Sequence, residues 1–175
     1  PLLKRLLMEA PGTYHHSIMV ANLAEVAAEE IGANTMLVRV GAYYHDAGKI
    51  KRPFFFGENQ LGGVNPHNKI SPSLSASIII SHVKDGLELA KEYNIPSAVS
   101  DMMIQHHGTT LVKYFYYTLK NSSDNPESVK EEDFIYPGPK PQSREAAIIM
   151  MADSVEAAVR SIQEPTVEKI ENMVN

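Results

Sequence analysis

Apolar residues recur every three or four positions along the chain, which predicts α-helices over most of its length. Residues that favour helix starts mark where three of them begin: Thr13, Asn34 and the pair Ser71-Pro72. The helices expected from these signals cover 13–31, 35–47, 71–92, 97–107, 110–120 and 143–161, and another begins near Thr166.

Two stretches lack this periodicity and are predicted to be loops. Residues 50–70 place glycines and prolines around Phe54-Phe-Phe, and residues 121–142 combine acidic and polar residues with four prolines. We expect residues 121–142 to form an excursion on the surface. Because no alternating strand pattern of useful length and no internal repeat occurs, the prediction is one all-α domain over residues 1–175. The sequence begins directly with Pro1-Leu-Leu-Lys-Arg-Leu-Leu, and a predicted helix starts shortly before its end. We therefore expect a domain excised from a longer protein.

The amino-acid composition excludes several kinds of functional site. The chain has no cysteine, which excludes disulfides, thiolate nucleophiles and sulfur-ligated zinc. Its net charge of -5 argues against a broad basic surface for long nucleic acids. A small anionic ligand stays possible, because bound metal ions can be the largest local charges in a site. No apolar run approaches the roughly 20 residues that a membrane span requires.

The seven histidines are the informative feature. On a wheel of about 100° per residue, His16 falls in an apolar stripe with Val20, Leu23, Ala27 and Ile31. A histidine in the middle of an apolar face needs a polar partner or a metal ion, because an unpaired polar group is costly to bury.

The same spacing holds for other ligand-type residues. Each follows an apolar or small residue by one helical turn: His45 after Gly41, His82 after Ile78, His106 after Met102, His107 after Met103, and Asp153 after Ile149. Five predicted helices therefore direct imidazoles or carboxylates inward, a mixture suited to iron, manganese, zinc or cobalt. His15 lies at the edge of its stripe and His67 in a loop, so both are left outside this set.

Asp46 is the candidate for a ligand shared by two ions, because a carboxylate offers two oxygens. Adjacent residues on a helix diverge by about 100°, so the members of His45-Asp46 and of His106-His107 can reach different ions. Hydrolysis by two metals uses such a pair, with the ions about 3.5–4 Å apart.

The ordered set His16, His45-Asp46, His82, His106-His107 and Asp153 resembles the HD superfamily of metal-dependent phosphohydrolases. Longer segments resemble the cytoplasmic HD domain of membrane-anchored PgpH-type (7TM-HD) proteins. These segments are Gly12-Thr-Tyr-His-His-Ser-Ile-Met-Val-Ala-Asn-Leu, Tyr44-His-Asp-Ala-Gly-Lys-Ile-Lys-Arg-Pro, Phe55-Phe-Gly-Glu-Asn-Gln and His106-His-Gly-Thr-Thr-Leu.

This resemblance implies a helical bundle around a dinuclear site of iron or manganese that hydrolyses cyclic di-AMP to linear pApA. It also implies a cytoplasmic domain attached to a bacterial membrane protein. By position, one ion would be held by His16, His45, Asp46 and Asp153, and the other by Asp46, His82, His106 and His107. No counterpart of the Gly-Tyr-Pro signature of HD-GYP enzymes follows His107, which favours cyclic di-AMP over cyclic di-GMP.

Catalysis would use a hydroxide that bridges the two ions and attacks phosphorus, because metal ions acidify bound water strongly. Lys49 would then contact a phosphate oxygen or the leaving oxygen, although a surface lysine at a helix end is the plain alternative. Arg144, Lys113 and His67 are further candidates for contacts with the substrate.

Aromatic residues among Tyr114, Tyr116, Tyr117 and Phe54 to Phe56 would stack on adenine, or else serve as core and loop anchors. Three other functions stay open: an HD enzyme acting on cyclic di-GMP or mononucleotides, a sensor that binds a nucleotide without turnover, and a helical structural domain. Homodimerisation also stays open.

Overall fold

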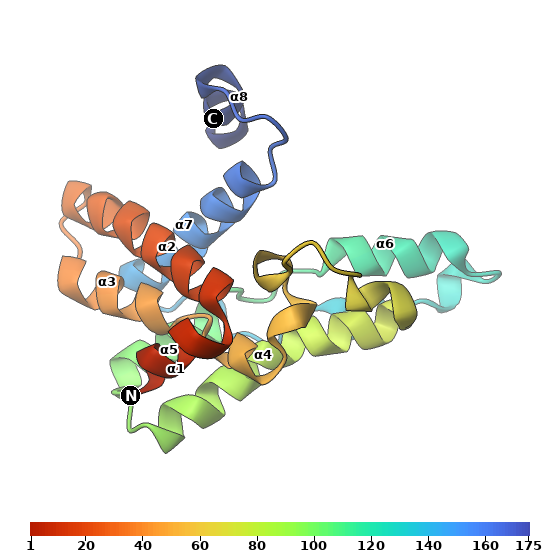
Figure 1. The fold of residues 1–175 in the computed structure, drawn as a ribbon, viewed down its shortest axis with the longest axis horizontal. Coiled ribbons are helices and arrows are strands. Elements are labelled where there is room, and N and C mark those ends of the chain that lie inside the picture. Colours follow the sequence, from red (N-terminus) through yellow and green to blue (C-terminus); the bar gives the residue numbers. More distant parts are fainter.

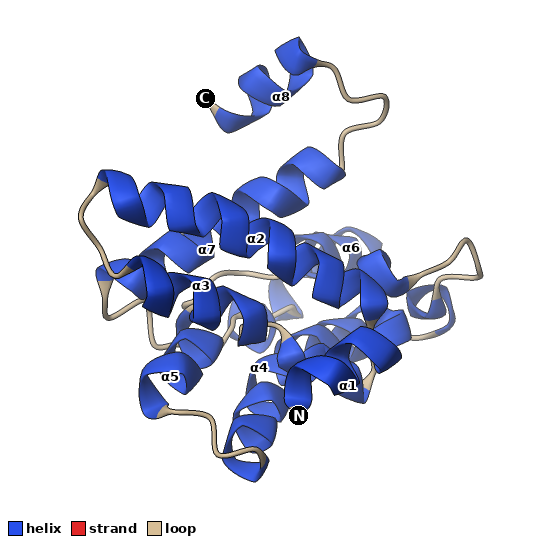
Figure 2. Cartoon of the chain, turned by 60° about the vertical axis from the view of Figure 1, so that its left-hand side comes forward, coloured by secondary structure: helices blue, strands red, loops and turns tan.

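The computed structural model describes all residues, 1–175, as helices joined by turns and loops (Figures 1 and 2). The α-helices are α1 (Leu2–Glu9), α2 (Pro11–Glu30), α3 (Thr35–Tyr44), α4 (Pro72–Glu92), α5 (Ser97–Gln105), α6 (Lys113–Ser122), α7 (Arg144–Arg160) and α8 (Val167–Val174). Short 3-10 turns lie between them: η1 (Ala47–Lys51), η2 (Pro53–Phe55), η3 (Gly57–Asn59), η4 (Pro66–Lys69), η5 (Pro126–Ser128) and η6 (Glu131–Phe134). The all-α prediction is confirmed, since β-pairing is limited to one isolated bridge between Leu111 and Ile135.

Side-chain caps explain why several helices begin where the sequence predicts. Asn34, Ser71 and Thr166 each accept a hydrogen bond from the backbone amide three residues ahead, at 2.9 to 3.2 Å. Such caps satisfy amides that a helix start otherwise leaves unpaired. Ser143 caps α7 in the same way.

The N-terminal region differs from the prediction. Residues 2–9 form a helix that the capping signals did not indicate, and α2 begins at Pro11 rather than at a Thr13 cap. Proline suits the first helical position because its missing amide would be unpaired there in any case. Thr13 instead lies inside α2, fully buried.

Two helices end earlier than predicted, and this matters for the site. Helix α3 ends at Tyr44 and α5 at Gln105, so His45-Asp46 and His106-His107 occupy the turns that follow. The angular argument for adjacent residues on a regular helix therefore does not apply to either pair.

The main core lies where α2, α3, α5 and α7 meet, and small side chains dominate it. Its buried members include Val20, Ala21, Ala24, Ala28, Val38, Ala42, Met102, Ala146, Ile148, Ile149 and Ala152. Alanines on α2 let the neighbouring helices approach closely, and Figure 2 shows α2 crossing in front of α7. The predicted stripe of α2 is wrong beyond Val20, because Leu23, Ala27 and Ile31 are exposed.

Residues 121–142 are only partly a surface excursion. Phe134 and Tyr136 are buried, Phe134 in a small cluster with Ala76 and Tyr116. The amide of Val112 donates to the carbonyl of Phe134 at 2.8 Å, which ties the returning chain to the start of α6. The excursion thus returns to the helices through Phe134 and Tyr136, while most of the residues around them stay exposed.

None of the helices combines the length and the apolar character that crossing a membrane requires.

Gly48 lies where η1 packs directly against the backbone of α4. A Cβ atom at this position would lie 1.9 Å from the carbonyl oxygen of His82 and 2.5 Å from the amide nitrogen of Gly86. Only glycine permits this approach, which holds the turn after Asp46 beside the helix that carries His82.

We predict that Gly48→Ala lowers the free energy of unfolding by about 1–3 kcal/mol, because the backbone must move to admit the methyl group. Gly63→Ala is the matched control, since nothing lies within 4 Å of its added Cβ. Thermal unfolding of both variants measures the difference. Equal stability of the two variants would contradict the close packing of η1 on α4.

Candidate metal centre

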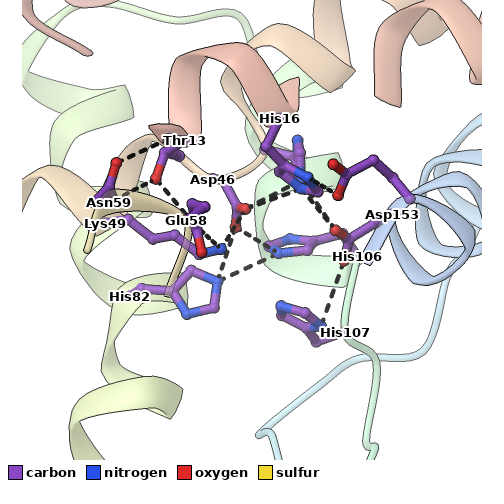
Figure 3. Close-up of polar contacts among 12 residues, drawn as sticks. Thr13, His16, Asp46, Lys49, Glu58, Asn59, His82, His106, His107 and Asp153 are labelled. Atoms are coloured by element: carbon purple, nitrogen blue, oxygen red, sulfur yellow. Dashed lines mark hydrogen bonds and ion pairs between the residues drawn. The ribbon is translucent and has the colours of Figure 1, made fainter. Parts of the chain in front are cut away.

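Seven ligand-type side chains converge from five segments of the chain (Figure 3). His16 comes from α2, His82 from α4 and Asp153 from α7, while the other four follow α3 and α5 in turns. Six of the seven are buried, and the His107 side chain is 24% exposed. Imidazoles and carboxylates far apart in the sequence thus meet in one enclosed site.

The carboxylate of Asp46 lies between two sets of histidines. Its Oδ1 is 3.3 Å from Nε2 of His82 and 3.4 Å from Nε2 of His106. Its Oδ2 is 3.4 Å from Nε2 of His45 and 3.5 Å from Nε2 of His16. Each oxygen therefore faces a different pair of imidazoles.

Two groups of four ligand atoms result, and Asp46 belongs to both. In each group the atoms lie within 4.8 Å of one another. The groups are His16, His45, Asp46 and Asp153, and Asp46, His82, His106 and His107. His106 and His107 both fall in the second group, although divergence on a regular helix would have allowed each to reach a different ion.

Unpaired buried atoms test whether metal ions fit here. Neither oxygen of Asp46 has a hydrogen-bond partner, and Nε2 of His45 has none either, although all three atoms are buried. Lys49 Nζ is 2.7 Å from Asp46 Oδ2, but this ion pair does not have the directionality of a hydrogen bond. Buried polar atoms are seldom left unpaired, so these atoms fit a divalent cation well.

Hydrogen bonds at the outer ring nitrogens orient three of the histidines. Nδ1 of His45 lies 2.7 Å from the carbonyl oxygen of Ala42, and His82 and His106 make the same contact with the carbonyl three residues back. Because a carbonyl only accepts, Nδ1 carries a proton in all three rings, and loss of any proton on Nε2 then gives the tautomer whose Nε2 lone pair faces Asp46. This is the tautomer that a metal ligand needs.

The charges in the site depress the pKa of its carboxylates. Burial alone would raise the pKa of Asp46, but Lys49 and His45 bring it well below its ordinary value. Burial lowers the pKa of His45, yet the carboxylates of Asp46 and Asp153 outweigh it and raise the pKa to about 10. A metal ion at this position would have to displace a proton from His45, so uptake of metal is expected to weaken as the pH falls.

Lys49 is held by a second acid that the sequence did not reveal. Its Nζ lies 2.8 Å from Glu58, whose carboxylate also accepts a hydrogen bond from Thr13 Oγ1 at 3.0 Å. Asn59 accepts from the Thr13 amide and donates to the Thr13 hydroxyl. The loop at 50–70 is thereby fastened to α2 and forms one wall of the site.

Tyr136 is another member that sequence reasoning missed. Its ring stacks on His107, with centroids 4.3 Å apart and an interplanar angle of 18°. Burial raises the pKa of its hydroxyl, so the side chain stays neutral. Nothing in the proline-rich segment around it distinguishes this residue from an ordinary loop anchor.

The three residues predicted to contact the substrate make no hydrogen bond or ion pair with the seven side chains of the cluster. His67 Nε2 lies 2.7 Å from the carbonyl oxygen of Phe55, and its ring packs against Phe55 and Phe115. Lys113 is exposed at the start of α6. Arg144 is exposed, contacts the Ile31 carbonyl at 3.4 Å, and precedes Asp153 by about 13 Å of helix. The structure therefore does not bring Arg144 to the cluster.

The aromatic candidates divide in the same way. Phe56 lies against the site, with its ring centroid 5.6 Å from that of His82. Tyr116 is packed in the cluster around Phe134, whereas Phe54, Tyr114 and Tyr117 are exposed. Phe56 is thus the aromatic residue of the predicted group that contacts a ligand side chain.

Comparisons with known proteins agree with this geometry. The HD domain family model matches residues 13–158. The chain is 59% identical to the cyclic-di-AMP phosphodiesterase PgpH of Listeria monocytogenes serotype 1/2a (strain 10403S) over 175 residues, and 59% identical to PgpH of Bacillus subtilis (strain 168) over 174 residues. These matches cover 100% and 99% of this chain but 24% of each relative, so the chain spans about a quarter of their length.

A solved structure is also similar. The L. monocytogenes phosphodiesterase PgpH HD domain in complex with cyclic di-AMP superimposes with a TM-score of 0.94 at 58% identity. The match covers 99% of this chain and 80% of that one.

We predict close to two transition-metal ions per chain by elemental analysis of the purified protein. Asp46→Ala should retain one ion or none, because both groups lose their shared ligand. His107→Ala should retain about one ion, because His107 belongs to a single group. Retention of both ions by Asp46→Ala would show that this carboxylate does not bridge them.

Proposed function

This chain belongs to the HD domain family, and on that basis we propose that it hydrolyses cyclic di-AMP to linear pApA. The similar proteins from L. monocytogenes and B. subtilis are cyclic-di-AMP phosphodiesterases, and the related HD domain was solved with that nucleotide bound. We further propose that the chain is the cytoplasmic domain of a longer bacterial membrane protein, since it spans a quarter of these relatives.

The observation that carries the proposal is the division of the Asp46 oxygens between two pairs of histidines. We propose iron or manganese as the two ions, held by the seven side chains of the two groups. When bound, such a pair supplies Lewis acidity toward a phosphodiester and lowers the pKa of water, which is the chemistry of two-metal hydrolysis.

Lys49 supplies a positive charge of the chain itself. Its side chain is 12% exposed and lies between Asp46 and Glu58. Burial would lower the pKa of Lys49, but these two carboxylates raise it, so the ammonium stays protonated. A fixed ammonium beside the bridging carboxylate stabilises the negative charge that develops on a phosphate or on the departing sugar oxygen.

Other parts of the chain shape the rest of the binding site. Phe56 and Tyr136 pack against His82 and His107 and are themselves buried, so they help to hold these two imidazoles in place. Contacts of His67 and Lys113 with the substrate stay predictions, and homodimerisation stays open. A sensor without turnover is the less favoured alternative, because such domains lack metal ligands and none is missing here.

The proposed reaction predicts a definite product. Incubated with manganese, the protein should convert cyclic di-AMP to linear pApA, resolved by chromatography, and chelator should stop the conversion. Cyclic di-GMP, tested at the same concentration, should be converted more slowly. Preferential hydrolysis of cyclic di-GMP would move the assignment to another HD enzyme. Metal-loaded protein that binds cyclic di-AMP without converting it would establish the sensor alternative.

Lys49→Ala should keep both metal ions and lose about 10²- to 10³-fold in kcat, the usual effect of removing one preorganised charge donor. Lys51→Ala is the matched control, since Lys51 is exposed on the same turn. Steady-state kinetics on metal-saturated protein measures both variants. If Lys49→Ala turns over at the rate of Lys51→Ala, the lysine has no part in the reaction.

A further inference from the structure

His16 differs from the other inward-facing histidines in how its outer nitrogen is held. His45, His82 and His106 each use a backbone carbonyl of their own segment for Nδ1. Nδ1 of His16 instead forms a hydrogen bond with the carboxylate of Glu156, which lies 140 residues away on α7. His16 is thus the one of these four whose ring orientation depends on a distant side chain.

One helix holds both nitrogens of this ring. Asp153 and Glu156 are three residues apart on α7, so they share a face. Asp153 Oδ1 is 2.9 Å from Nε2 of His16, and Glu156 contacts Nδ1. The Glu156 side chain is 10% exposed and the His16 side chain 1%, so the contact is largely protected from water.

Glu156 is itself held in place by a cation. Arg160, one turn further along α7, donates from Nε to both Glu156 oxygens at 3.2 and 3.3 Å. Arg160 Nη1 also lies 3.9 Å from Glu58, which pairs with Lys49. A chain of alternating charges therefore runs from His16 around the site and returns to Asp46 through Lys49.

We infer that Glu156 is a positioning residue for metal binding: it keeps the proton of His16 on Nδ1, so that Nε2 serves the ion shared with His45, Asp46 and Asp153. An ionised carboxylate only accepts hydrogen bonds, so the hydrogen between it and His16 belongs to the imidazole. A carboxylate partner also makes the ligand nitrogen more basic than a carbonyl partner does. The inference rests on the proposed two-metal site but not on the identity of the substrate.

The effect of removing Glu156 should be confined to one ion. His82, His106 and His107 make no hydrogen bond to Glu156, and the outer nitrogens of His82 and His106 keep their carbonyl partners when it is lost. Loss of a partner of this kind typically costs 10- to 100-fold in metal affinity. General damage to the fold would weaken both ions.

The test titrates metal-free protein with Mn²⁺ against a competing chelator and follows the spin-coupled signal of the manganese pair by electron paramagnetic resonance. In Glu156→Ala one ion should bind about 10- to 100-fold more weakly while the other keeps its wild-type affinity. At a manganese level that just saturates the wild type, the spectrum should change from a coupled pair to an isolated ion. Equal weakening of both ions, or of neither, would overturn the inference.

Two further variants separate the hydrogen bond from charge and from folding. Glu156→Gln keeps an oxygen that accepts from Nδ1, so it should restore most of the affinity that Glu156→Ala loses. Glu88→Ala removes an exposed acid of α4 and should match the wild type. A Gln variant as weak as the Ala variant would overturn the role of the hydrogen bond. Two tightly bound ions without cyclic di-AMP hydrolysis would refute the proposed substrate and leave this inference standing, whereas wild-type protein that binds fewer than two ions would refute both.

Discussion

The buried carboxylate of Asp46 is the constraint on which the rest of the site depends. Its two oxygens lie among four imidazoles and have no hydrogen-bond partner within the protein. An ionised carboxylate in a dry interior costs several kcal/mol unless cations or donors compensate it. Lys49 compensates part of this charge, and divalent ions held by the two ligand groups would compensate the rest, so metal binding and the stability of this part of the fold are expected to be coupled.

The architecture around Asp46 serves to fix the donors before any ion arrives. Gly48 lets the turn after Asp46 lie against α4, next to His82. Carbonyl oxygens set the tautomers of three histidines, and Glu156 does so for His16. A ligand set oriented in advance loses little conformational entropy on binding, which favours a well-defined pair of ions over loose association with acidic side chains.

Much of this could be predicted from sequence because the relevant signals are local. Cap residues such as Asn34 and Ser71 act on amides three positions ahead, and histidines or aspartates on apolar faces reveal themselves by spacing alone. The turns at His45-Asp46 and His106-His107 were not foreseen, because helix ends depend on tertiary packing. The apolar stripe of α2 was misplaced beyond Val20, because small alanines rather than larger side chains make its contacts.

The residues that sequence reasoning missed act over long distances. Nothing in the sequence marks these residues, because Glu58 lies in a loop, Tyr136 in a proline-rich segment and Glu156 near a helix end, where such types are common. Only the fold brings them to the site. Arg144 is the opposite case: the sequence suggested it as a phosphate contact because of its positive charge, but its place at the start of α7 keeps it away from the site. Residue type and spacing identified the candidate metal ligands, but contacts between distant segments decide what surrounds them.

The central claim is that Asp46 bridges two ions, and anomalous diffraction from crystals of the manganese-loaded protein tests it most directly. The account predicts two anomalous peaks roughly 3.5–4 Å apart, one beside each oxygen of Asp46. One peak should also contact His16, His45 and Asp153, and the other His82, His106 and His107. A single peak, or two peaks of which only one contacts Asp46, would contradict it.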